Sequence, residues 1–173
     1  HHRAVAAQDA GFFEEELTEV TIAQRKADSI IVDTDEGPRR SSSLEALAKL
    51  SAPFRDGGTV TAGNASTVND GACSLLLSSE KMAISQGLIP RARVVSMAAT
   101  GLHPRIMGFG PFEASKKVLT LAGSKLDQID VFELNEAFAA QTLAVTRALG
   151  LSDDAENVNP NGGAIALGHP LGM

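Results

Sequence analysis

The strongest segment of the sequence is Asn161-Gly162-Gly163-Ala164-Ile165-Ala166-Leu167-Gly168-His169-Pro170-Leu171-Gly172. Its glycines and alanines leave room for the close approach of another backbone or of a ligand, and the small residues of 164–167 predict a strand. Pro170 biases His169 away from the α-helical region, so the backbone fixes the direction of the imidazole. Histidine is the usual side chain for proton transfer near neutral pH. The alternative is a core histidine in a tight turn.

A second segment upstream predicts a junction between a strand and a helix. It is Phe132-Glu133-Leu134-Asn135-Glu136-Ala137-Phe138-Ala139. Ligands of open α/β sheets bind at the carboxyl ends of strands, where the Asn135 amide can hold a water or donate to an oxyanion. The alternative, which this segment alone favours, is Asn135 as a helix N-cap with Glu136 in the first turn.

A third segment is typical of a structured turn. It is Thr61-Ala62-Gly63-Asn64-Ala65-Ser66-Thr67-Val68-Asn69-Asp70-Gly71-Ala72. Asparagine, aspartate and glycine favour turns because their side chains bond the local backbone or allow unusual dihedral angles. The Ser66 hydroxyl can hydrogen-bond a ligand. The alternative is a turn held only by its own side chains.

The rest of the chain predicts alternating strands and helices. Helices are predicted over His2–Asp9, Ser43–Leu50, Glu80–Gln86 (with Ser79 as N-cap), Pro111–Leu121 (with Gly123 past its end) and Ala137–Leu149 (ending at Gly150). Half-buried strands are predicted over Leu17–Ile22 and Ser29–Thr34, and further strands over Ala72–Leu77 (buried), Arg93–Ala98, Gln128–Leu134 and Ala164–Leu167. The alternation after residue 91 predicts a parallel α/β layer.

Composition excludes several classes of protein. Apolar residues make up 43% and charged residues 21% of the 173, as in ordinary soluble domains. The net charge of −6, without any basic stripe, argues against nucleic-acid binding. No apolar run approaches the roughly 20 residues that span a bilayer, so no membrane partner is expected. The single cysteine, Cys73, is predicted to be a buried core residue. A single cysteine fits a reducing, cytoplasmic compartment. The cysteine and the histidines do not have the spacing of a zinc site.

Two weaker candidates carry charge in loops. Arg39-Arg40 beside Ser41-Ser42-Ser43 can meet a phosphate, although such a pair is more often part of a solvated turn. His103 precedes Pro104 and is expected to be an exposed loop residue.

Together these segments resemble the thiolase family, and the resemblance covers essentially the whole chain in the right order. It is carried by the turn at 61–72, by Met107-Gly108-Phe109-Gly110-Pro111, by Asn135-Glu136-Ala137-Phe138 and by Gly162–Pro170. The segment Val158-Asn159-Pro160-Asn161, with Leu167 and Leu171 around His169, resembles the degradative branch of the family. Within that branch it is most similar to the 3-oxoadipyl-CoA thiolases. The implied fold is α/β, the layered αβαβα thiolase-like fold, represented only in part.

The resemblance implies three domain portions. Residues 1–60 would be the remainder of the loop domain that covers coenzyme A, 61–90 the end of the first α/β domain, and 91–173 the first half of the second. It also implies an acyltransferase that is a homodimer or homotetramer. Such an enzyme cleaves 3-oxoacyl-CoA with CoA, or runs the reverse Claisen condensation, through a cysteine acyl-enzyme.

The same resemblance implies roles for individual residues. His169 would activate the nucleophile and help form an oxyanion hole, and Asn135 would hold a water in that hole. The contacts to coenzyme A, which is a substrate and not a permanently bound cofactor, map onto Arg39, Phe54, Ser66, Met107, Ala137 and Phe138. Ser66 would face the pantetheine and Arg39 the nucleotide end, although Arg40 leaves that register open. The three larger apolar side chains would form the pocket walls.

The chain departs from the family pattern in its cysteines. The family's nucleophilic cysteine would lie upstream of His1, and its second cysteine, in a Cys-x-Gly motif, downstream of Met173. Cys73 stands where the family usually has alanine. We therefore expect an internal fragment that is inactive alone; the alternative is a CoA-binding module that has lost the chemistry. A condensing enzyme or lipid-carrier relative is disfavoured because the Asn-Glu-Ala-Phe segment is intact.

Overall fold

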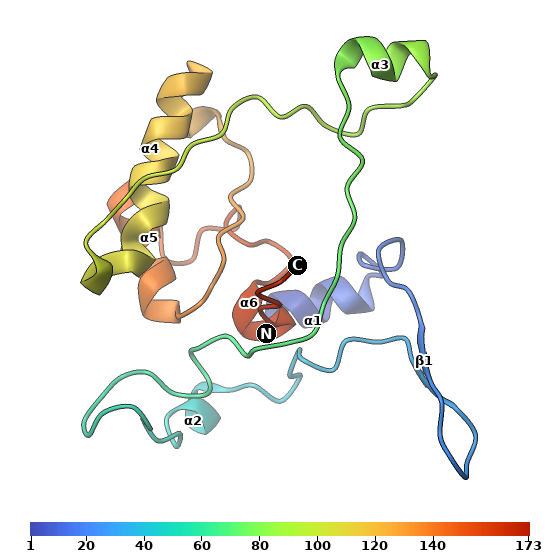
Figure 1. The fold of residues 1–173 in the computed structure, drawn as a ribbon. Helices are drawn as coiled ribbons and strands as arrows, with labels where there is room; N and C mark the ends of the chain where they lie inside the picture. The colour runs from blue at the N-terminus through green and yellow to red at the C-terminus, as the bar shows by residue number, and fades with distance from the viewer.

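The computed structural model describes all residues from His1 to Met173. The elements in order are α1 (His2–Asp9), β1 (Val20–Ile22), β2 (Ile30–Val32), α2 (Leu44–Leu47), α3 (Glu80–Ser85), the 3-10 helix η1 (Pro104–Phe109), α4 (Gly110–Ala122), the 3-10 helix η2 (Leu126–Gln128), α5 (Ala139–Leu149) and α6 (Ala164–Leu167). Figure 1 shows α4 and α5 together on one side, α1 and α6 at the centre near both termini, and long extended segments linking them to α3.

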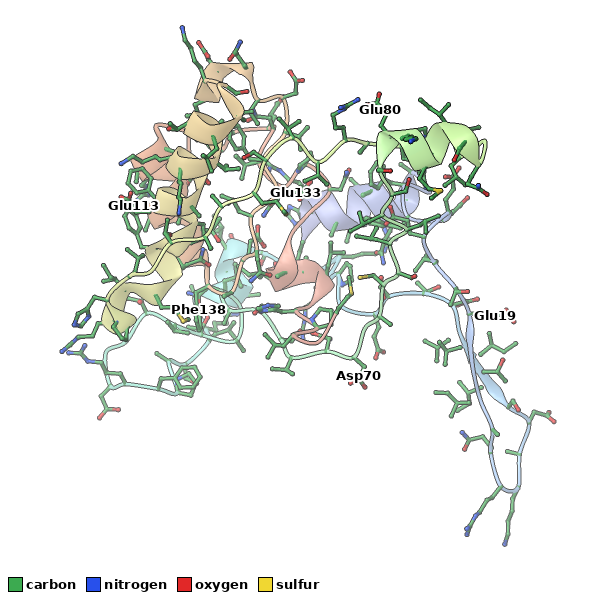
Figure 2. All side chains as sticks on the ribbon, turned by 45° about the horizontal axis from the view of Figure 1, so that its top comes forward. Glu19, Asp70, Glu80, Glu113, Glu133 and Phe138 are labelled. Atoms are coloured by element: carbon green, nitrogen blue, oxygen red, sulfur yellow. The ribbon has the colours of Figure 1, made fainter.

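The only sheet is an antiparallel hairpin. Val20 pairs with Val32 and Ile22 with Ile30, which confirms strands within the two alternating runs. The expected half-burial is wrong, because all six strand residues are exposed. The hairpin and its side chains project away from the rest of the molecule beyond Glu19 (Figure 2).

Helix ends follow the capping signals in the sequence. Helix α1 has the predicted bounds, and the Ser79 hydroxyl accepts a 3.2 Å hydrogen bond from Met82 N–H at the start of α3. Left-handed glycines, Gly123 and Gly150, end α4 and α5, as is common for helix C-termini. The helix predicted over Ser43–Leu50 is reduced to the four residues of α2, with Ser43 as its N-cap.

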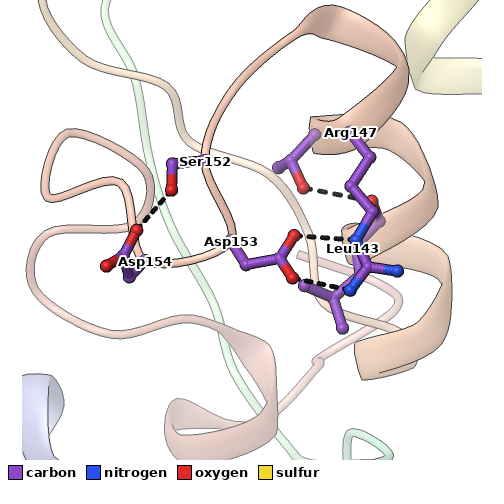
Figure 3. Close-up of polar contacts among 6 residues, drawn as sticks. Leu143, Arg147, Ser152, Asp153 and Asp154 are labelled. Carbon is purple, nitrogen blue, oxygen red and sulfur yellow. Dashed lines mark hydrogen bonds and ion pairs between the residues drawn. The ribbon is translucent and has the colours of Figure 1, made fainter.

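Polar contacts fasten the far end of α5 (Figure 3). The Arg147 guanidinium donates to both carboxylate oxygens of Asp153 at 2.8 and 2.6 Å. These hydrogen bonds lower the pKa of Asp153 and raise that of Arg147. Both side chains are well exposed, so the pair fixes the direction of the chain after α5 more than it stabilises the fold.

Two predicted strands are wrong. Ala72–Leu77 and Arg93–Ala98 form no ladder with any other segment; Leu75 and Leu76 are each 82% exposed and Val95 is 72% exposed. A strand is defined by its hydrogen bonds to a neighbouring strand, and these runs have no neighbour within the chain. Cys73 lies in the first run and is exposed, contrary to the prediction of a core residue.

Two further segments differ from their predicted strands. Ala164–Leu167 is the helix α6, because alanine and leucine are strong helix formers and the free N–H groups of its first turn find a partner described below. Gln128–Leu134 gives the end of η2 and then a single parallel bridge from Phe132 to Val158. The predicted parallel layer is therefore absent within this chain.

The small core joins the start of the chain to its end. Ala4 of α1 is completely buried, and a Cβ placed on Gly162 would lie 2.6 Å from the Ala4 Cβ. The neighbouring Arg3 guanidinium donates to the carbonyls of Val158 and, at 3.1 Å, of Ala155. Helix α1 thus packs directly on the loop that leads into α6.

Candidate active site

The turn at 59–66 is held by its own asparagine. Asn64 Oδ1 accepts from Thr61 N–H at 2.7 Å, and its Nδ2 donates to the Thr59 carbonyl at 2.8 Å. This is the self-bonded turn that the sequence offered as an alternative. The Ser66 hydroxyl takes no part in it, so Ser66 remains available to groups from elsewhere.

Three segments far apart in sequence meet beside this turn. Ser66 N–H donates to the Ala137 carbonyl at 3.0 Å, and Ala139 N–H donates to the Asn64 carbonyl at 2.9 Å. On the other side, His169 N–H donates to the Thr67 carbonyl at 3.0 Å. Segment 64–68 therefore lies between 137–139 and 168–169, with single bridges to each. The structure brings together four of the predicted site residues: Ser66, Ala137, Phe138 and His169.

His169 faces Ser66 within this arrangement. The His169 Nδ1 lies 3.5 Å from the Ser66 Oγ, the outer limit of a hydrogen bond, and both residues are half-buried. Gly168 has φ +97°, and a Cβ there would lie 2.5 Å from the Asn69 Oδ1. Only glycine fits this approach, so the backbone and Ser66 together direct the imidazole and leave Nε2 without a partner in the chain. Such a nitrogen can carry a proton to or from a bound substrate.

Asn135 is exposed and its side chain makes no hydrogen bond within the chain. The alternative interpretation of Asn135 as a helix N-cap is wrong, because Phe138 occupies that position at the start of α5. Residues 135–137 instead form an extended connection from Leu134 to the segment that pairs with Ser66.

Glu136 and Asn159 form a polar connection that the sequence reasoning missed. Glu136 Oε1 accepts from Asn159 Nδ2 at 2.9 Å, and Glu136 Oε2 accepts from Ile165 N–H at 3.2 Å. The carboxylate therefore receives an N–H of the first turn of α6. Asn159 also bonds both backbone groups of Leu134, its Oδ1 accepting at 2.8 Å and its Nδ2 donating at 2.9 Å.

Asn159 holds this position at a backbone cost. It is 3% exposed and is the only non-glycine residue with positive φ, +46°, a region in which asparagine is the most tolerated non-glycine residue. The available signal was Asn159-Pro160-Asn161-Gly162, a run typical of turns. It could indicate the turn but not the partner 25 residues upstream.

Negative charge accumulates near the junction. Burial raises the pKa of Glu133, and the neighbouring carboxylate of Glu136 raises it further. Neither residue has a lysine or arginine partner among the ion pairs of the chain.

The remaining candidates for binding coenzyme A are exposed. Phe54, Met107 and Phe138 are 80%, 77% and 42% exposed. The Arg40 guanidinium pairs with both carboxylate oxygens of Asp9, whereas the Arg39 side chain has no partner in the chain. No hydrogen bond joins Arg39, Phe54 or Met107 to His169.

The comparisons decide the family. A model of the thiolase N-terminal domain matches residues 1–81, and one of the thiolase C-terminal domain matches 88–173. The chain belongs to the thiolase family. It is 55% identical to a beta-ketoadipyl-CoA thiolase of Acinetobacter baylyi over 98% of its own length. It is also 55% identical to a 3-oxoadipyl-CoA/3-oxo-5,6-dehydrosuberyl-CoA thiolase of Escherichia coli over 99%. The chain spans 42% and 43% of the length of these two thiolases.

Solved thiolases confirm the predicted thiolase-like α/β fold, of which this chain represents a part. An acetyl-CoA acetyltransferase of Bacillus anthracis matches 99% of the chain with TM-score 0.94 at 44% identity, and human mitochondrial 3-ketoacyl-CoA thiolase matches 98% with TM-score 0.90 at 44% identity. The chain covers 43% and 42% of those structures. The extended runs at 72–77 and 93–98 therefore follow the backbone path of a thiolase, although within this chain they have no neighbouring strand.

Proposed function

We propose that this chain provides the histidine, the asparagine and part of the coenzyme A surface of a thiolase that cleaves 3-oxoacyl-CoA with CoA to acyl-CoA and acetyl-CoA. The reverse Claisen condensation would use the same groups. The observation that carries the proposal is the meeting of Ser66, the 137–138 backbone and His169 through hydrogen bonds between three distant segments.

In this proposal His169 moves a proton and Asn135 stabilises charge. Nε2 of His169 takes the proton of a thiol, and the Asn135 amide holds a water that donates to the enolate oxygen of the departing thioester. One such donor contributes about 3–4 kcal/mol to the transition state in other oxyanion holes. The nucleophile would be a cysteine outside these 173 residues, because the only cysteine, Cys73, makes no hydrogen bond to His169 and stands where the family usually has alanine.

Coenzyme A would lie along Ser66, Ala137 and Phe138, with Phe54 and Met107 as further apolar walls. Arg39 rather than Arg40 would meet the nucleotide end, because the Arg40 guanidinium is already occupied by Asp9. Residues 1–60, 61–90 and 91–173 would be the three domain portions. The protein would act in the cytoplasm as a homodimer or homotetramer; no helix is long and apolar enough to cross a membrane.

The favoured substrate is 3-oxoadipyl-CoA. Relatives named for the beta-ketoadipyl or 3-oxoadipyl thioester are 55–57% identical to the chain, whereas acetyl-CoA acetyltransferases of Pseudomonas aeruginosa and Syntrophomonas wolfei are 52% and 51% identical. Acetoacetyl-CoA is therefore the competing substrate to assay beside it.

The first test is thiolysis of both thioesters by the purified chain after its intact mass is confirmed. An 18.0 kDa species is expected to be inactive. The reading frame that contains the chain is expected to encode one cysteine upstream and another downstream in thiolase motifs, and its product to be active. A complete frame without them, or an active 18 kDa species, would contradict the proposal.

The alternative function is a CoA-binding module without catalysis, favoured by the absence of any second cysteine in the chain. Calorimetry with CoA, combined with the thiolysis assay, separates the two functions. If the protein encoded by the complete reading frame binds CoA but does not catalyse thiolysis, the result supports the binding module; turnover would exclude it.

A further inference from the structure

The carboxylate of Glu136 has no role in the proposed function, although this residue directly follows the proposed catalytic Asn135. It bonds to Asn159 Nδ2 at 2.9 Å and to Ile165 N–H at 3.2 Å. No basic side chain neutralises it. The two N–H donors therefore fix the direction of the carboxylate and, with it, the backbone at residue 136.

Space beside this carboxylate is provided by the absence of a side chain. A Cβ on Gly163 would lie 2.6 Å from both Glu136 oxygens, well inside normal contact distance. Glu136 can approach the first turn of α6 only because residue 163 is glycine.

Helix α6 transmits this contact to His169. It has only four residues, and Gly168 and His169 follow at once. His169 is held in turn by the Thr67 carbonyl and by Ser66, and Ser66 N–H donates to Ala137, the residue after Glu136. The contacts close a ring that runs from Glu136 through α6, His169, Ser66 and Ala137 back to Glu136.

We propose that Glu136 is a positioning residue that sets the separation and orientation of Asn135 and His169. In this role Glu136 acts through Asn135 and His169 and not on the substrate itself. Its carboxylate joins the backbone next to Asn135 to helix α6, which is followed at once by Gly168 and His169, so loss of this contact opens the ring at one point. The effect on catalysis rests on the proposed function, whereas the ring of contacts does not depend on it.

The test replaces Glu136 in the complete protein that contains this chain, and reads the ring without relying on turnover. The variants are Glu136→Ala and Glu136→Gln, with Glu133→Gln as the matched control carboxylate. Mass spectrometry follows amide exchange at Ile165 and exchange of the histidine ring C2–H, which reports the surroundings of each imidazole.

Glu136→Ala is expected to speed exchange of the Ile165 amide about tenfold, the equivalent of one lost hydrogen bond. The His169 ring should exchange at a rate closer to that of the exposed His103, and amide exchange at Val145 in α5 should not change. Glu136→Gln keeps one acceptor and should give an intermediate effect; it also serves if the alanine variant does not fold. Glu133→Gln should leave His169 unchanged.

Faster exchange at Ile165 with an unchanged His169 ring would show that Glu136 only caps α6, and would overturn the proposal. Unchanged exchange at both positions would overturn the contact itself. Failure of the proposed function is seen separately, as wild-type protein without thiolysis, because these exchange rates do not depend on activity.

Discussion

Two parts of the molecule that differ in composition behave in opposite ways: one is rich in polar residues and glycine, and the other is mostly apolar. The segments 64–69, 135–139 and 159–169, which contain the ring, are joined by side-chain and backbone hydrogen bonds across about 100 residues of sequence. The extended runs 72–77 and 93–98 are exposed and make no ladder. The ring is complete because all its partners lie within this chain, whereas a strand needs another strand beside it.

The two parts differ in the kind of interaction that determines their geometry. Polar residues and glycines set the ring through specific donors, acceptors and contact distances, so its geometry survives without a surrounding sheet. The apolar runs carry only a preference for burial, which is satisfied by whatever covers them.

The largest effect is expected from His169→Ala. If Nε2 carries the proton, thiolysis by the complete enzyme should fall by about 10²–10⁴-fold, the usual contribution of a general acid or base, with little change in fold. Steady-state rates and circular dichroism measure the two quantities. Near-normal turnover would remove His169 from the mechanism.

Asn159→Ala should weaken the ring by removing one of the two partners of Glu136, and it changes the most buried polar residue of the chain. It removes the hydrogen bonds to Leu134 and Glu136 and places alanine at φ +46°, so a loss of about 2–4 kcal/mol in unfolding free energy is expected. Urea unfolding measures it. Asn159→Gly removes the backbone strain but does not restore the side-chain hydrogen bonds. If the glycine variant were as stable as wild type, the hydrogen bonds would contribute little.

Gly163→Ala tests the close approach of Glu136. The added methyl would meet both carboxylate oxygens, and a loss of about 1–3 kcal/mol is expected, as for other overpacked positions. Gly172→Ala is the control because a Cβ there meets nothing within 4 Å. Equal melting temperatures for the two variants would contradict the described contact.

The sequence was informative about the parts of this fold that depend on local chemistry. Ser79, Gly123 and Gly150 marked helix ends correctly, because caps satisfy backbone groups within a few residues. The motif containing Ala164–Leu167 was located correctly, but its backbone was predicted as a strand. One N–H of the first turn of that helix donates to the Glu136 carboxylate, which lies 29 residues away in sequence and is not visible in the local pattern.

The candidate site was predicted unevenly for the same reason. Ser66, Ala137, Phe138 and His169 came from long motifs, and the structure brings them together. Their chemical roles, with those of Asn135, Arg39, Phe54 and Met107, stay predictions. Glu136 and Asn159 were missed because an acid and an amide on separate segments show no pattern until the backbone brings them together.

A smaller effect is expected at Glu133, where the size of the effect depends on pH. Burial and the charge of Glu136 raise the pKa of the folded state above the ordinary value of 4.5, so the folded protein binds the proton more tightly and loses stability as pH rises through that folded pKa. Glu133→Gln should therefore be slightly more stable than wild type at pH 7. The difference should vanish below pH 4.5, as urea unfolding at both values can show. A gain only at low pH would reverse the assigned sign.

The smallest effect is expected in the apolar run. Leu75 is 82% exposed, so Leu75→Ser in the 173-residue chain should change the unfolding free energy by less than about 0.5 kcal/mol. A buried leucine would cost several times more on truncation, and a loss of about 2 kcal/mol or more would show that the run packs against something in solution. Leu75→Ser therefore separates the two parts of the molecule: the same chain should tolerate a polar residue in the extended run and reject a single methyl group at Gly163.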